Sequence, residues 1–133
     1  MRTNAPRKAQ VRDLLIALSE RRVEDVTAEL AADVEWDVVG SVTHRGRDDV
    51  ARAIGGPPDR SLHLRNLLSH GKQVAAEGTT TSVTRQAVHF AHVVTYSGHG
   101  KSAKVRSIIT YRIDEVPGSL TARPRDSPVP APR

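Results

Sequence analysis

The apolar residues of this chain change their spacing partway along it, and that change limits the fold more than any other feature. Near the start, Val11, Leu14, Leu15 and Leu18 recur at the three- and four-residue intervals of one helix face. Beyond the Gly-Gly-Pro-Pro run at 55–58, apolar residues alternate with polar ones or form short β-branched runs between tight turns. Helices followed by a run of strands predict an α+β fold.

Two further helices are expected before the run of strands that begins at residue 61. Residues 23–34 place Val23, Val26 and Leu30 on one side of a second helix. A short strand is expected at 34–40, followed by a turn or brief strand at 41–46. A third helix is expected from Gly46 until the Gly-Gly-Pro-Pro run ends it.

The remaining strands are joined by short turns, which predicts an antiparallel sheet. They are expected at residues 61–71, 73–83, 86–97 and 103–114. Residues 1–115 then form one domain. Residues 116–133 are rich in Pro, Ser and Arg without an apolar period, so we expect a disordered tail there.

Composition excludes several function classes. The chain has no cysteine, which excludes disulfides, thiolate metal sites and a cysteine nucleophile, and fits a cytoplasmic location. No apolar run is long enough to cross a membrane. The net charge of +5 raises the question of a nucleic-acid partner, but the basic residues are scattered and few aromatics are present to stack on bases. No cofactor is indicated.

Several segments resemble the nuclear-transport-factor-2-like superfamily, and SnoaL-like members in particular. ADVEWDVVGSVTHRGRDDVARAI is similar to the middle segment of that family, with Gly40 ending a strand and Gly46 opening a helix. LLSHGKQVAAEGT and HFAHVVTYSGHGKSAKVRSIITY are similar to its strands. The resemblance covers about residues 7–113. It implies a cone-shaped fold, with N-terminal helices packed on a strongly curved antiparallel sheet, an apolar pocket and a homodimer.

The same resemblance implies a site. DVVGS resembles the ketosteroid isomerase segment that carries the general base, and Asp37 falls on that position. The second acid of those isomerases would fall near His92, whereas their oxyanion tyrosine would fall near Leu14, which cannot donate a hydrogen bond. Asp37 and His92 are therefore the candidate catalytic pair, with Asp37 taking a proton and His92 returning one.

The strand at 86–97 supplies further candidates. Its alternate residues Val88, Phe90, His92, Val94 and Tyr96 share one face, which is expected to line the pocket. A buried core histidine is the alternative for His92. His89 and His92 cannot share a metal ion, because a separation of three places them on opposite faces of a strand, and no metal site is expected.

Three more pocket-lining candidates come from other segments. Trp36 is either pocket lining or core packing between helix and sheet. His44 follows Gly40 in the expected turn, either at the pocket mouth or in solvent. Tyr111 is a candidate because a buried hydroxyl needs a partner.

Two functions follow from the resemblance and these residues. The first is a small-molecule enzyme that abstracts a proton next to a carbonyl, of isomerase, cyclase or dehydratase type. The second is a non-catalytic ligand-binding or dimerisation module with the same fold. The partner expected in either case is a small apolar or carbonyl-containing molecule.

Overall fold

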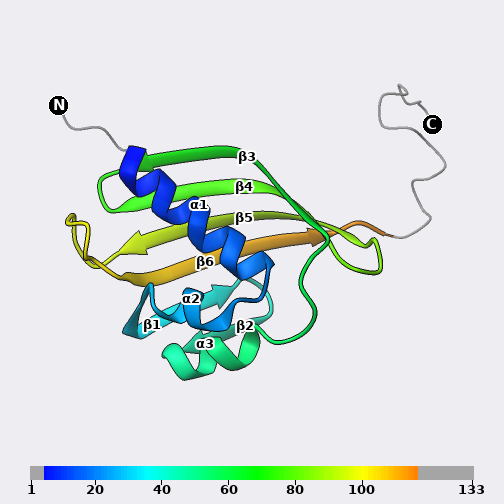
Figure 1. Cartoon of the computed structure of the whole chain (residues 1–133), viewed down its shortest axis with the longest axis horizontal. Coiled ribbons are helices and arrows are strands. Elements are labelled where there is room, and N and C mark those ends of the chain that lie inside the picture. The colour runs from blue at the N-terminus through cyan, green and yellow to red at the C-terminus, as the bar shows by residue number, and fades with distance from the viewer. Residues whose placement is uncertain (1–4, 117–133) are drawn as a thin grey trace.

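The structure is a computed structural model that describes residues 5–116. The predicted order is confirmed: two helices, a short strand with a brief second strand, a third helix and then a run of four strands (Figure 1). In chain order the elements are α1 (Ala5–Ser19), α2 (Val23–Thr27), β1 (Leu30–Val38), β2 (Val42–Arg45), α3 (Arg47–Ala53), β3 (Ser61–His70), β4 (Gln73–Thr81), β5 (Ala87–Tyr96) and β6 (Val105–Asp114). The predicted tail, apart from Val116, lies outside the described residues.

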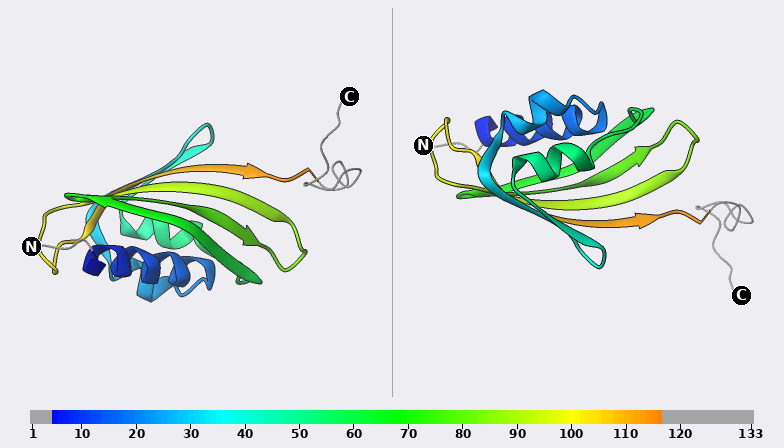
Figure 2. Two further views of the ribbon diagram at one scale, coloured as in Figure 1. Left: turned by 90° about the horizontal axis from the view of Figure 1, so that it is seen from above. Right: turned by 90° about the horizontal axis from the view of Figure 1, so that it is seen from below.

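The six strands form one sheet in the order β2-β1-β6-β5-β4-β3. The sheet is mixed, because β1 pairs in parallel with β6 while the other neighbours are antiparallel. The expectation of a wholly antiparallel sheet was therefore wrong. It missed that the last strand returns to the middle of the sheet, between β5 and β1. The helices cover one face of a sheet that is twisted and gently bent, not curled into a tight cone (Figure 2).

The predicted second helix was too long. The structure ends α2 at Thr27, and Leu30 already belongs to β1. Leu30 is paired with Val105 of β6, whose backbone N–H donates to the Glu29 carbonyl at 2.9 Å. Pairing with a strand 75 positions away in sequence thus overrides the local helical spacing, as tertiary contacts commonly do.

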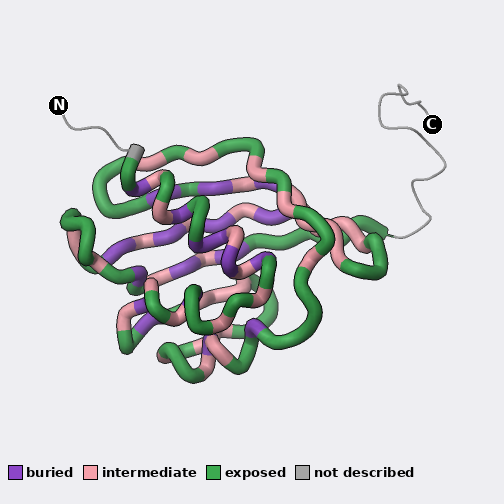
Figure 3. The backbone as a smooth tube through the Cα atoms, in the orientation of Figure 1, coloured by how far each residue is buried: buried purple, intermediate pink, exposed green. Residues whose placement is uncertain are grey.

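The core lies between the helices and the face of the sheet that they cover, here called the inner face (Figure 3). The predicted apolar stripe of α1 is confirmed, because Val11, Leu14 and Leu15 are buried. They pack with inward residues of the strands, such as Val34, Val74 and Val94. The opposite, uncovered face is called the outer face.

The backbone geometry explains why glycine occupies positions 46 and 78. Gly46 has φ +86° where the chain turns from β2 into α3, a conformation that costs other residues energy. Gly78 lies opposite the irregularity in β3 between Leu64 and Asn66. A Cβ atom added at Gly78 would come within 2.0 Å of the His63 carbonyl oxygen, so the two strands approach as closely as they do only because no side chain intervenes.

Candidate functional site

A cavity of about 840 Å³ opens between the inner face and the helices, here called the inner-face cavity. Its walls come from the C-terminal half of α1, the β1–β2 hairpin and the inward residues of β3 to β6. Its apolar lining includes Leu15, Leu18, Val38, Leu62, Val88 and Phe90. A volume of this size is typical of sites for small organic ligands.

Four side chains on the sheet side of the cavity come from facing positions on β5 and β6. The register pairs His92 with Thr110, and Phe90 with Arg112. Because side chains alternate along a strand, these four share the inner face with Trp36 of β1. The pairing of β1 with β6 then brings the indole of Trp36 to the hydroxyl of Thr110.

A short chain of hydrogen bonds crosses the floor. The Trp36 Nε1–H donates to Thr110 Oγ1 at 2.7 Å, and Thr110 Oγ1 lies 2.8 Å from His92 Nδ1. Within residues 5–116, the one acceptor recorded for the Thr110 hydroxyl proton is His92 Nδ1. Thr110 therefore donates to Nδ1, and the histidine carries its proton on Nε2. The Nε2–H is left as a donor for the cavity that His92 lines.

His92 is neutral at ordinary pH. Burial lowers its pKa to about 4, with a smaller contribution from the positive charge of Arg112. The ring stacks on Phe90 with centroids 4.8 Å apart, which fixes its orientation. A fixed neutral imidazole can donate a hydrogen bond to a carbonyl oxygen. It is not charged, so it is a weak source of a proton.

Asp37 does not lie beside His92, and the predicted pair was wrong. Asp37 pairs with Thr43 and Ile109 on the outer face, and the Thr43 hydroxyl donates to its Oδ1 at 3.2 Å. Its neighbour Trp36 takes the inward position, so strand alternation turns the carboxylate away from the inner-face cavity. Asp37 and His92 are separated by the sheet itself.

The structure places Trp36, His44 and Phe90 together with His92 in the cavity wall. His44 lies on β2, not in a turn, and its ring centroid is 5.4 Å from that of Trp36. Its Nδ1 lies 3.9 Å from a carboxylate oxygen of Asp49, which also accepts the Arg45 backbone N–H. The backbone hydrogen bond is the main cause that lowers the pKa of Asp49, which keeps this carboxylate charged near His44.

The two tyrosines do not line the cavity, contrary to expectation. Tyr96 is fully buried in the core, where the Arg7 guanidinium lies 4.0 Å from its ring centroid, and burial raises its pKa to about 12. Tyr111 is 52% exposed and lies on the outer face. Its strand has an irregularity in register opposite Thr95 and Tyr96, which the sequence does not reveal.

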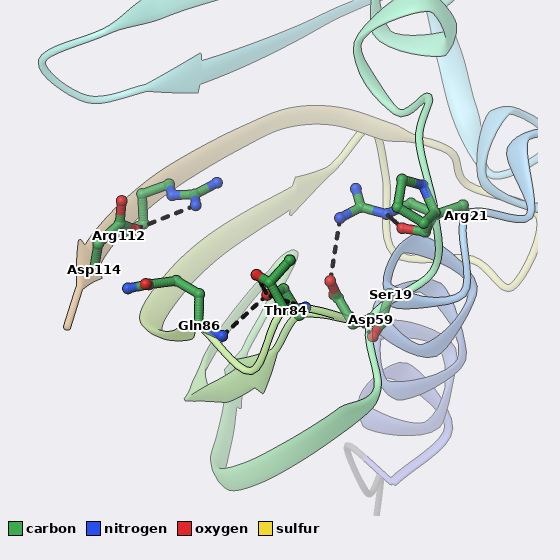
Figure 4. A network of polar contacts seen from close by, with 9 residues as sticks. Ser19, Arg21, Asp59, Thr84, Gln86, Arg112 and Asp114 are labelled. Carbon is green, nitrogen blue, oxygen red and sulfur yellow. Dashed lines mark hydrogen bonds and ion pairs between the residues drawn. The ribbon is translucent and has the colours of Figure 1, made fainter. Parts of the chain in front are cut away.

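Charged pairs flank the cavity mouth on two sides (Figure 4). On the helix side, Asp59 accepts from the Ser19 hydroxyl at 3.1 Å and from Arg21 at 3.2 Å. On the sheet side, Arg112 donates to Asp114 at 3.3 Å. Sequence reasoning missed these residues. Arg21 and Asp59 are far apart in the chain, and the inward positions of β6 depend on its register.

Residues 5–116 contain no cluster of three or more His, Asp or Glu side chains that could hold a metal ion. None of the helices found there is both long and apolar enough to cross a membrane.

The chain is similar to a known protein family and to several solved structures. A family model described as SnoaL-like domain matches residues 11–115. No curated protein matches the chain by sequence. A putative ketosteroid isomerase from Kribbella flavida is similar in structure, with 23% identity, a TM-score of 0.65, and coverage of 96% of this chain and 92% of that chain.

Two further solved structures are similar. An epoxide hydrolase described as LEH-like, from M. tuberculosis, has 18% identity and a TM-score of 0.64, over 82% of this chain and 84% of that one. An NTF-2 like protein of unknown function from Burkholderia xenovorans has 16% identity and a TM-score of 0.66, over 87% and 94%. At these identities the likeness shows a shared fold alone.

Proposed function

The chain belongs to the SnoaL-like domain family, and from that premise we propose that its inner-face cavity binds a small molecule with an apolar body and a hydrogen-bond acceptor. The acceptor, a carbonyl oxygen for example, takes the Nε2–H of His92. The apolar body lies against Leu15, Leu18 and Leu62. Family membership alone does not select an activity, since structural neighbours include both a putative isomerase and a hydrolase.

The observation that carries the proposal is the hydrogen-bond chain from Trp36 through Thr110 to His92. It satisfies Nδ1 and leaves the Nε2–H as a donor of known position in a cavity whose lining mixes apolar side chains with polar ones such as Thr80 and Gln86. A hydrocarbon that fills the cavity would cut the Nε2–H off from water at a cost of roughly 1–3 kcal/mol, whereas a ligand that supplies an acceptor avoids that cost. This favours ligands with a carbonyl over plain hydrocarbons.

Binding without catalysis is the leading function, because the cavity floor holds no free carboxylate among the described residues. Proton abstraction next to a carbonyl needs a base close to the bound ligand. The carboxylates that line the cavity are Asp59 and Asp114, both toward its mouth. Asp59 uses both oxygens in hydrogen bonds, and Asp114 is 63% exposed beside Arg112.

Trp36 makes the proposal testable, because it is the single tryptophan of the chain and lines the cavity. Titration with 2-decanone should change its fluorescence in a saturable way, and decane should bind more weakly. His92→Leu, which keeps the side-chain volume, should abolish the preference for the ketone. Asp37→Asn on the outer face is the matched control. A ketone preference that survives His92→Leu would refute the proposed role of His92.

Catalysis is the second candidate, favoured by the position of Asp59, whose side chain is only 13% exposed in the cavity wall. In that case the protein should catalyse deuterium exchange next to the carbonyl of an apolar ketone in heavy water, as followed by NMR. Asp59→Asn should stop the exchange, whereas Asp37→Asn should not. Absence of any exchange above the buffer rate would leave binding as the function.

The outer face supports a proposal of a homodimer. The exposed apolar side chains on it include Leu68, Tyr111 and Ile113, and none of the helices within residues 5–116 covers this face of the sheet (Figure 2). Ile108 and Thr110 of the same strand as Tyr111 and Ile113 are buried on the inner face and are not part of this surface. Sedimentation equilibrium should give twice the chain mass of 14.5 kDa, and Ile113→Lys should reduce it to the monomer mass. A wild-type monomer at micromolar concentration would contradict the dimer.

A further inference from the structure

Of the two arginines that line the inner-face cavity, Arg112 is the less committed to protein partners. Within residues 5–116, its recorded hydrogen bond is a single one from Nη2 to Asp114 at 3.3 Å. The two side chains are 53% and 63% exposed and lie two positions apart on one strand. An exposed ion pair of this kind contributes little free energy in water, so a ligand can replace Asp114 as the partner of Arg112 at small cost.

The other arginine at the mouth, Arg21, is held by more partners. Arg21 donates through Nε to the Pro57 carbonyl and through Nη2 to Asp59. Asp59 in turn receives the Ser19 hydroxyl, so each of its oxygens has a donor. This pair is balanced in charge and held from both sides. Figure 4 shows the Arg112 guanidinium directed into the space between the two sides of the mouth.

Arg112 and His92 are close enough to share one ligand group. Arg112 pairs with Phe90, and His92 is the next inward residue on β5. Diagonal neighbours of this kind on one face of a sheet lie about 7–8 Å apart at their backbones, within reach of a long side chain. The positive charge of Arg112 also acts on the His92 ring, as its effect on the pKa of His92 shows.

We propose that the inner-face cavity recognises carboxylates with an apolar body, and that the carboxylate group binds between the Arg112 guanidinium and the Nε2–H of His92. Arg112 offers a planar fork of donors that matches a carboxylate, and His92 adds a neutral donor. The apolar body then crosses the sheet toward Leu18 and Leu62 beneath α1. Three strand spacings separate β6 from β3, or about 14 Å, which suits an aliphatic chain of about ten carbons.

This inference rests on the proposed ligand-binding function, and the test separates the two. Decanoate and decanamide have the same apolar chain and both carry a carbonyl oxygen, but only decanoate is charged at neutral pH. Both are titrated against the full-length protein, with Trp36 fluorescence and calorimetry as readouts. Decanoate should bind about tenfold more tightly than decanamide, as expected for a charge-assisted contact.

Variants identify the group that makes the difference. Arg112→Met should lower decanoate affinity by about tenfold and change decanamide affinity by less than about twofold. Arg112→Lys keeps the charge but loses the fork, so its affinity for decanoate should be intermediate. Arg106→Met is the matched control, because Arg106 is exposed on the same strand and does not line the cavity. Circular dichroism checks that each variant is folded.

The outcomes distinguish the two proposals. If both ligands bind equally and Arg112→Met changes neither affinity, carboxylate recognition is refuted while ligand binding stands. If Arg106→Met lowers decanoate affinity as much as Arg112→Met does, the effect is one of net charge and the assigned site is wrong. If neither ligand binds, both the proposed function and this inference are refuted.

Discussion

Acid should destabilise this protein through His92 in particular. An unperturbed histidine has a pKa of about 6.5, whereas burial holds the pKa of His92 at about 4. Above about pH 6.5 the ring is neutral in both the folded and the unfolded chain, so it adds no pH dependence. As the pH falls from 6.5 toward 4, only the unfolded chain binds the proton, and unfolding becomes more favourable.

The magnitude follows from the two pKa values. At about pH 5 the linkage lowers the free energy of unfolding by about 2 kcal/mol relative to pH 7.5. The limit below pH 4 is about 3 kcal/mol. Either figure is a large part of the stability of a domain of this size, which is typically about 5–15 kcal/mol.

Urea unfolding of wild type and His92→Leu between about pH 7.5 and 5 measures this contribution. The other titrating groups contribute to both proteins, so the difference between the two pH profiles isolates His92. The wild type should lose about 2 kcal/mol more than the variant over this range. Parallel profiles would refute the burial argument, as would an NMR titration that gives His92 a pKa near 6.5 in the folded protein.

Two other substitutions test the packing of the sheet and the cavity floor. Gly78→Ala should destabilise the fold by more than about 2 kcal/mol, because the added Cβ meets the His63 carbonyl at 2.0 Å. Gly100→Ala is the control and should have a small effect, because a Cβ there meets nothing within 4 Å. Thermal unfolding compares the stabilities of the two variants. Thr110→Val should cost about 1–3 kcal/mol by removing the acceptor of the Trp36 Nε1–H, and it should shift the emission of Trp36. Similar stabilities for the two glycine variants, or unchanged emission of Thr110→Val, would contradict these accounts.

Parts of the site could be predicted from the sequence because they depend on local spacing. The two-residue period placed Phe90 and His92 on one face of β5, and both line the cavity. The same period requires the adjacent residues Trp36 and Asp37 to point to opposite faces of their strand. The period does not determine which of the two points toward the helices. The family resemblance placed Asp37 inward, whereas the structure places Trp36 there.

Other parts depended on register between distant strands. β6 alternates like any strand, but an irregularity opposite Thr95 and Tyr96 sets which of its residues point inward. Thr110 and Arg112 therefore reach the cavity while Tyr111 does not. No pattern within residues 103–114 reveals that irregularity, because it arises from pairing between two segments.

The sequence by itself determined the class of fold, the order of its elements and the apolar face of α1, since these follow from the spacing of residues along one segment. Tertiary structure alone decided the end of α2, the parallel pairing of β1 with β6, and the orientation of Asp37 and Trp36. Each of these is a choice between two locally acceptable arrangements. The choice is made by the free energy of packing against a partner far away in the chain, which local spacing does not contain.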